Sequence, residues 1–304
     1  MSHRKVAVIG SSNTDMVIKS DHLPLPGETV IGGKFTMNAG GKGANQAVAA
    51  ARLGGDVIFL ARVGNDAFGK EAIDGFRKEH IDTEHISIDD EMPSGVALIL
   101  VDEKGENSIS VSLGANEKLM PEHMSPLQSE LPKDSLLLVQ LETPIETVAH
   151  LAQLAKANDF RLILNPAPAQ ALPAAVLKDL YMITPNAIEA ELLTGIPVKD
   201  DESAQKAALA LRASGVQNVI ITMGGDGAYV LNNHLDERVP ASPTKVVDTT
   251  AAGDTFNGAL LVALNEGKSL KASIEFGHKA AASSVGILGA QNSIPTKEDL
   301  ISQS

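Results

Sequence analysis

The chain has 304 residues, 43% of them hydrophobic, which is enough for one large α/β domain or two smaller ones. A formal net charge of −13 disfavours nucleic acid and anionic lipid as partners, and the lack of cysteine excludes disulfides, thiolate nucleophiles and cysteine-bound metals. No apolar run approaches the roughly 20 residues that a membrane helix needs, and no signal region opens the sequence, so we expect a cytoplasmic protein that binds neither nucleic acid nor membranes.

Short apolar runs alternate with helical patterns along most of the chain. Six runs rich in Val, Ile and Leu predict buried strands, at residues 5–10, 57–63, 135–142, 161–165, 181–186 and 219–224. Four segments have the apolar periodicity of helices, at residues 44–53, 146–157, 202–213 and 255–266. This alternation predicts an α/β fold in which helices cover a parallel sheet.

Two segments interrupt the alternation, at about residues 13–36 and 94–113. The first contains the turn-rich stretch LPLPGET, and the second predicts two strands joined at 102–107. We interpret both as parts of a small β-lid on a single domain formed by residues 1–304. The strand at 96–101 is apolar on both faces, which favours a homodimer, although an ordinary edge hairpin is the alternative.

Polar residues end four of the predicted strands. They are Glu142, Asn165, Asn186 and Thr222. Open α/β sheets bind ligands at the carboxyl ends of their strands. Any one of these residues alone is more typical of a helix cap or a turn, but four together favour a binding cleft.

Residues 246–256 (VVDTTAAGDTF) lead from a short apolar run through small residues into an amphipathic helix. The N–H groups of Ala251, Ala252 and Gly253 would form an anion hole, because small residues allow close approach and a helix start offers unpaired N–H groups. Asp254 is either a simple N-cap or a catalytic base. Phosphoryl transfer accounts for both features, since a base would take the hydroxyl proton while the N–H groups stabilise the transferred group.

A second small-residue turn, residues 38–47 (NAGGKGANQA), also leads into a helix. It is not a Walker loop, because the upstream glycine would fall at Thr36 and Gly43 replaces the Ser or Thr after the lysine. A polar turn with Asn45 one helical turn inside favours hydrogen bonds to sugar hydroxyls instead.

These motifs resemble the ribokinase family of carbohydrate kinases over essentially the whole chain. The resemblance is carried by GSSNTD at 10–15, PGET at 26–29, AGGKGANQAVAAARLG at 39–54, QLE at 140–142, NPAPA at 165–169, TPNAIEAELLTG at 184–195, VDTTAAGDTFNGAL at 247–260 and GAQNSIP at 289–295. It implies a ribokinase-like three-layer α/β sandwich with a central mostly parallel sheet and a small β-sheet lid that also pairs two subunits. Ala187 departs from the family, which commonly has glutamate there.

The resemblance also implies a role for each site residue. The sugar would be held by Asn13, Asp15, Gly41, Lys42, Asn45 and Glu142, with Asp254 as the base. ATP would be bound by Asn186, Thr222, Gly224, Gly227, Asn257 and His278. Asn186 and Glu189 would position Mg²⁺ and phosphate, and a K⁺ site would comprise Asp248, Thr250, Ser284, Gly289 and Ser293, whose oxygen ligands suit hard cations.

The implied reaction is transfer of the γ-phosphoryl of MgATP to the 5-hydroxyl of D-ribose. The alternatives are a kinase for another small furanose, such as deoxyribose, fructose or a nucleoside, and a catalytically silent sugar-binding protein. Lys42, Asn45 and Asp15 favour a hydroxyl-rich sugar over an apolar base. Asp254 together with the small-residue turn argues against a silent protein.

Overall fold

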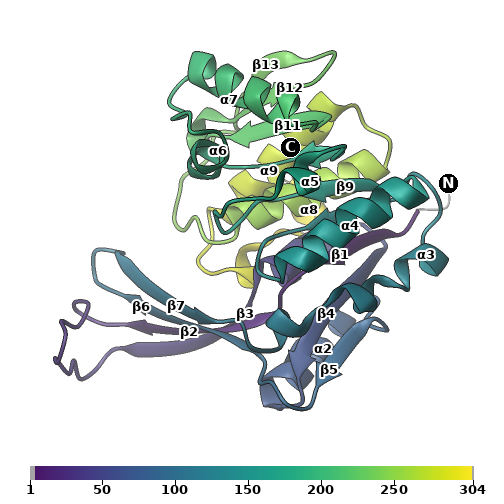
Figure 1. Cartoon of the computed structure of the whole chain (residues 1–304). Helices are drawn as coiled ribbons and strands as arrows, with labels where there is room; N and C mark the ends of the chain where they lie inside the picture. The colour runs from purple at the N-terminus through teal and green to yellow at the C-terminus, as the bar shows by residue number, and fades with distance from the viewer. Residues whose placement is uncertain (1–3, 303–304) are drawn as a thin grey trace.

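Parallel strands buried on both faces form the centre of the structure, a computed structural model that describes residues 4–302 (Figure 1). Within these residues a nine-stranded sheet has the order β13-β12-β11-β10-β9-β8-β1-β4-β5. Its parallel strands are β1 (Val6–Ile9), β4 (Val57–Gly64), β5 (Ile86–Asp89), β8 (Leu136–Val139), β9 (Arg161–Leu164), β10 (Met182–Ile183) and β11 (Asn218–Thr222). An antiparallel edge is added by β12 (Ala228–Leu231) and β13 (Asp236–Val239).

Helices cover both faces of this sheet. Successive side chains of each strand point to opposite sides, so apolar strands present an apolar surface on each face. Val6 and Val8 pack with α1 (Lys42–Arg52), α8 (Ala252–Asn265) and α9 (Leu270–Ser284). Ala7 and Ile9 pack with α4 (Ile145–Asn158) and α7 (Asp201–Ala213) on the other side. The predicted three-layer arrangement is therefore confirmed.

Smaller elements complete the two layers. They are α2 (Ala67–Lys78), α3 (Leu127–Glu130), α5 (Ala174–Leu177), α6 (Ala187–Thr194) and α10 (Lys297–Ser302), with short 3₁₀ turns at Gly114–Lys118, Pro121–Met124, Gly224–Asp226 and Gln291–Ser293. Across residues 4–302, every helix is too short or too polar to cross a membrane.

Two of the predicted helices begin two or three residues earlier than expected, and both differences lie at the candidate site. Helix α1 starts at Lys42 after Gly41, whose φ of 88° is a conformation that favours glycine. Helix α8 starts at Ala252 after Ala251, which adopts the left-handed region at φ 59°. Asp254 therefore lies inside the first turn of α8, and its interpretation as a simple N-cap is wrong because Ala251 occupies that position.

A second sheet projects from the body of the molecule (Figure 1). In the described chain its strand order is β3-β2-β6-β7. The strands are β2 (Asn13–Lys19), β3 (Lys34–Gly40), β6 (Gly95–Val101) and β7 (Asn107–Ser112). They come from the two segments that predict a lid, with β3 extending four residues past the expected limit at 36, and we call this sheet the lid.

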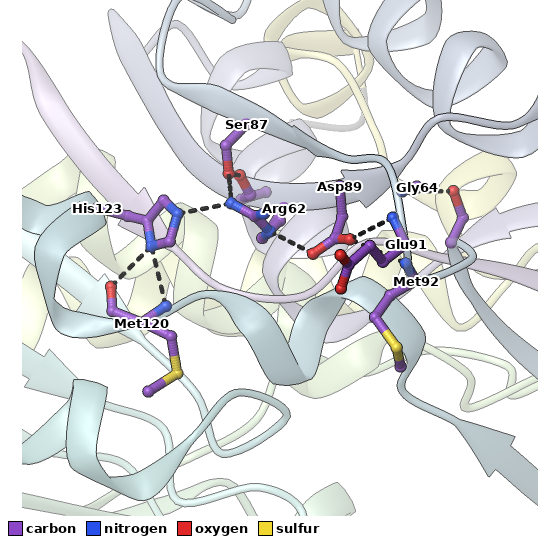
Figure 2. A network of polar contacts seen from close by, with 10 residues as sticks. Arg62, Gly64, Ser87, Asp89, Glu91, Met92, Met120 and His123 are labelled. Atoms are coloured by element: carbon purple, nitrogen blue, oxygen red, sulfur yellow. Dashed lines mark hydrogen bonds and ion pairs between the residues drawn. The ribbon is translucent and has the colours of Figure 1, made fainter.

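A polar network fastens the segment that leads into the lid (Figure 2). Arg62 of β4 donates to Asp89 at 2.8 Å, and Asp89 also accepts the N–H groups of Glu91 and Met92 at 2.9 and 2.8 Å. These hydrogen bonds hold the pKa of Asp89 down to about 2, so the carboxylate stays charged and the turn stays closed. The base of β6 is thus anchored to the body.

Candidate active site

The Asp254 carboxylate is buried and held on both oxygens. Asn45 Nδ2 donates to Oδ2 at 3.0 Å, and Gln46 Nε2 donates to Oδ1 at 2.9 Å. Burial raises the pKa of Asp254, while the charge of Lys42 and the two amide hydrogen bonds oppose that rise. Asp254 lines a cavity of about 210 Å³, so it faces open space at the carboxyl end of the sheet.

Main-chain N–H groups at the start of α8 line the same cavity. Ala252 N–H donates to the Thr249 carbonyl at 3.2 Å, so it is already engaged, and its predicted place in the anion hole needs correction. The left-handed turn at Ala251 curls the chain back and brings Thr249 within reach of that N–H. Within residues 4–302, the N–H groups of Ala251 and Gly253 have no acceptor, so these two remain available to an anion.

Glu142 and Lys42 meet at the start of α1. Glu142 Oε2 accepts the Ser11 hydroxyl at 2.5 Å and the Lys42 N–H at 3.0 Å. Gly41 allows this turn, because a Cβ on it would lie 2.7 Å from the main-chain nitrogen of Asn13. The glycine run therefore brings polar groups together at close main-chain range.

Asp15 projects from the lid toward this cluster. A Cβ on Gly40 would lie 2.3 Å from Asp15 Oδ2, so only glycine leaves room for that carboxylate. Burial, followed by repulsion from Glu142 and Asp254, raises the pKa of Asp15 to about 6, although Lys42 opposes the rise. Asp15 therefore changes charge near neutral pH.

Asn13 and Asn45 each use one amide atom in a hydrogen bond within the protein and leave the other for a ligand. Asn13 Oδ1 accepts from Asn116 Nδ2 at 2.8 Å, which leaves the Asn13 amide nitrogen for other contacts. Asn45 Oδ1 is buried and has no partner among the described residues, whereas its Nδ2 donates to Asp254. A buried acceptor without a donor is costly, so the site is suited to a ligand hydroxyl at this position.

Lys42 interacts electrostatically with four carboxylates. Burial lowers its pKa, but Asp254, Glu142, Glu189 and Asp15 outweigh that effect and raise it. Lys42 therefore stays protonated and partly balances the negative charge of the site.

A second cavity of about 250 Å³ adjoins the first and shares with it Thr222, Thr249, Ala252 and Gly253. Gly224, Gly227 and His278 line this second cavity together with Phe256 and Val285. His278 Nε2 is buried without a partner in the described chain, and burial lowers the pKa of this imidazole and so favours its neutral form. This lining suits an apolar ligand with polar edges.

Two predicted nucleotide contacts lie elsewhere. Asn186 and Asn257 line the cavity of Asp254 rather than the second one. Asn257 accepts the Thr184 hydroxyl at 2.7 Å and donates to the Gly253 carbonyl at 2.8 Å, so it braces the turn that carries the free N–H groups.

The predicted Mg²⁺ residues form a helix cap. Glu189 Oε2 accepts the Asn186 N–H at 2.8 Å, and Asn186 Oδ1 accepts the Glu189 N–H at 2.8 Å. Glu189 Oε1 remains for a cation or its water, whereas the single side-chain oxygen of Asn186 is already engaged by the cap. Both residues line the Asp254 cavity. Among residues 4–302, no three acidic, histidine or cysteine side chains gather into a metal site.

The predicted K⁺ residues are only partly brought together. Asp248 accepts Thr250 Oγ1 at 2.7 Å and the Gly289 N–H at 2.9 Å, which joins the two loops. Ser284 and Ser293 instead donate to the Ala281 and Ala290 carbonyls of their own turns, as serine hydroxyls commonly do there.

Three buried amides belong to this site, of which Asn165 was predicted at the cleft and Gln46 and Gln140 were absent from the predicted set. Gln46, Gln140 and Asn165 connect to Asp254 by hydrogen bonds of 2.6 to 2.9 Å. A polar amide inside an otherwise apolar strand or helix face is a signal that could have found Gln140 and Gln46, because such burial requires partners.

Similarities to known proteins cover nearly the whole chain. The sequence pattern of the pfkB family carbohydrate kinases matches residues 3–297. The chain is 43% identical over 298 residues to the ribokinase of Haemophilus influenzae, covering 98% of this chain and 97% of that protein. It is 36% identical to the deoxyribokinase of Salmonella typhi, with 96% of each covered. The structure of Arabidopsis thaliana ribokinase complexed with ribose and ATP matches with a TM-score of 0.91 at 30% identity, with 98% of each chain covered.

Proposed function

Because the chain belongs to the pfkB family of carbohydrate kinases, we propose that it transfers the γ-phosphoryl of MgATP to the 5-hydroxyl of D-ribose and so forms ribose 5-phosphate. One observation carries the proposal. A carboxylate held on both oxygens and two unengaged N–H groups line the same cavity, beside a second cavity that suits a nucleotide base.

Side chains and main-chain groups of the site would have different roles in the reaction. Asp254 would take the proton of the sugar hydroxyl as its oxygen attacks the γ-phosphorus. The N–H groups of Ala251 and Gly253 would donate to the oxygens of the transferred group and stabilise the charge that develops there. Bound Mg²⁺ would neutralise phosphate charge, and Glu189 and Asn186, which line the cavity, would hold it or its water.

The lid and the start of α1 favour a hydroxyl-rich sugar. Asp15, Asn45 and Glu142 each present a carboxylate or amide oxygen that can accept from a hydroxyl. The ribokinase relatives support ribose as the substrate, while the deoxyribokinase relative keeps 2-deoxyribose as the second candidate.

An assay of ADP release tests this assignment. We expect turnover with ATP and Mg²⁺ on ribose, lower kcat/KM on deoxyribose and fructose, and little on adenosine. Running each sugar with and without K⁺ tests the cation loop at Asp248, where we propose that K⁺ activates the enzyme. An equal rate of ADP release with and without ribose would contradict the assignment of a sugar kinase.

We also propose that the chain forms a homodimer through the lid. Pairing places Met16, Met37 and Leu98 on one lid face, and Asp15 on the other. Leu98 is 55% exposed and Phe35, paired with Ile18 on the same face, is 56% exposed. Since the Asp15 face turns toward the site, the apolar face is left for a second subunit.

Replacing Leu98 by Lys should therefore convert the dimer to a monomer, because a charge would be buried in the apolar interface. Analytical ultracentrifugation would measure the molecular mass in solution. Leu209→Lys is the matched control, since Leu209 is 54% exposed on α7, away from the lid. Wild-type sedimentation as a monomer at micromolar concentration would contradict the dimer.

A further inference from the structure

A chain of buried amides runs behind the Asp254 carboxylate. Gln140 Nε2 donates to Gln46 Oε1 at 2.6 Å. Gln46 Nε2 then donates at 2.9 Å both to Asp254 Oδ1 and to Asn165 Oδ1. Gln46 is 0% exposed and is absent from the lining of the Asp254 cavity, so it touches the base from behind.

A main-chain carbonyl at one end of this row of amides fixes the orientation of all of them. Asn165 Nδ2 donates to the Thr184 carbonyl at 3.2 Å, and a carbonyl can only accept. Asn165 must therefore offer its oxygen to Gln46, which in turn must point its nitrogen toward both Asn165 and Asp254. A flipped Gln46 amide would place its oxygen against two acceptors, so this orientation is the one that satisfies every partner.

We infer that Gln46 is a positioning residue that fixes the orientation of the Asp254 carboxylate. Asn45 holds the other oxygen, so the two neighbouring residues of α1 determine both the position and the rotation of the group. This inference rests on the proposed function, because it assigns to Gln46 a part in the same reaction.

Removing the Gln46 amide should change how the reaction depends on pH. Its hydrogen bond favours the charged form of Asp254 and lowers a pKa that burial raises. The charged groups around Asp254 are Lys42 on α1, Asp15 in the lid, Glu142 after β8 and Glu189 on α6. None of them changes in a Gln46 variant, so a shifted profile would report the lost hydrogen bond.

The experiment compares kcat between pH 5 and 9 in wild type and Gln46→Met. The acid limb of the profile is the low-pH range over which kcat rises with pH. We expect this limb to shift to higher pH by about one unit, so that kcat falls roughly tenfold at pH 6 and less at pH 8. The ribose Kd, measured by calorimetry, should change less than about threefold, because Gln46 does not line the cavity.

Two further variants keep the inference testable. Gln46→Glu preserves the shape of the side chain if Gln46→Met fails to fold, and it should move the acid limb further because it places a second carboxyl beside Asp254. Thr147→Val is the stability control, since it removes a buried 2.7 Å hydrogen bond to the Leu119 carbonyl outside the site. It should lower the melting temperature and leave the acid limb unchanged.

An active wild type with an unmoved acid limb in both Gln46 variants would overturn the positioning role. So would a ribose Kd that rises as much as kcat falls, since Gln46 would then act in binding. A wild type without turnover on any sugar contradicts the proposed function itself, and with it this inference.

Discussion

Replacing Asp254 by Asn should lower kcat roughly 10²–10⁴-fold, the range that loss of a general base produces. The amide cannot take the proton of the sugar hydroxyl at neutral pH, while the shape of the side chain is kept. Sugar affinity should change less than about tenfold, because Asp15, Glu142 and Asn45 still accept from hydroxyl groups. Steady-state kinetics and calorimetry with ribose would separate the two effects.

Asp201→Asn provides the matched control for Asp254→Asn. Asp201 accepts from Arg238 at 2.6 Å and lies at the start of α7, on an exposed surface. Removing this carboxylate should leave kcat within about twofold, because an exposed ion pair contributes only about 0–1 kcal/mol. Near-normal turnover in Asp254→Asn would remove the assignment of the base.

Local pattern was sufficient to predict most of the fold. The strand at β1 is predictable because VAVI is apolar at every position, which is typical of a strand buried on both faces of a parallel sheet. The antiparallel edge strand β13 was missed, because DERV is polar and partly exposed and has no strand periodicity.

The candidate site was predictable to a smaller extent. Gly41 and Asp254 belong to short motifs whose residue types match their chemistry, so the sequence alone suggests them. The partners of Asp254 come from distant segments, and Gln140 and Asn165 approach it only because β8 and β9 are neighbours in the sheet. Local pattern also fails at Ala252, because the left-handed turn at Ala251 decides which N–H groups are free.

Replacing Lys42 by Met should produce the second large effect, a fall in kcat/KM of about 10²-fold at pH 7. The charge of Lys42 lowers the pKa values of Asp254, Asp15 and Glu189, all of which burial raises. Without Lys42 these pKa values rise further, so more of the base is protonated at pH 7. Raising the pH to 9 should therefore restore part of the lost activity.

The activity of the Lys42→Met variant should recover as the pH rises, but its free energy of unfolding should decrease. A carboxyl whose pKa is higher in the folded state than in the unfolded state favours folding at low pH, and this benefit is lost as the pH rises through the folded pKa. The variant should match wild type at pH 5 and unfold more easily at pH 8, by about 2 kcal/mol. Urea denaturation at the two pH values would measure the free energy of unfolding.

Lys42→Arg separates the charge from the shape of the side chain. Arginine keeps the positive charge, so the pH at which activity is half-maximal should stay within about half a unit of wild type even if its bulk weakens ribose binding. A Lys42→Met variant whose activity and stability both fall at high pH would show that Lys42 acts through packing. Activity that recovers with pH while stability declines requires a cation that controls the protonation of its carboxylate neighbours.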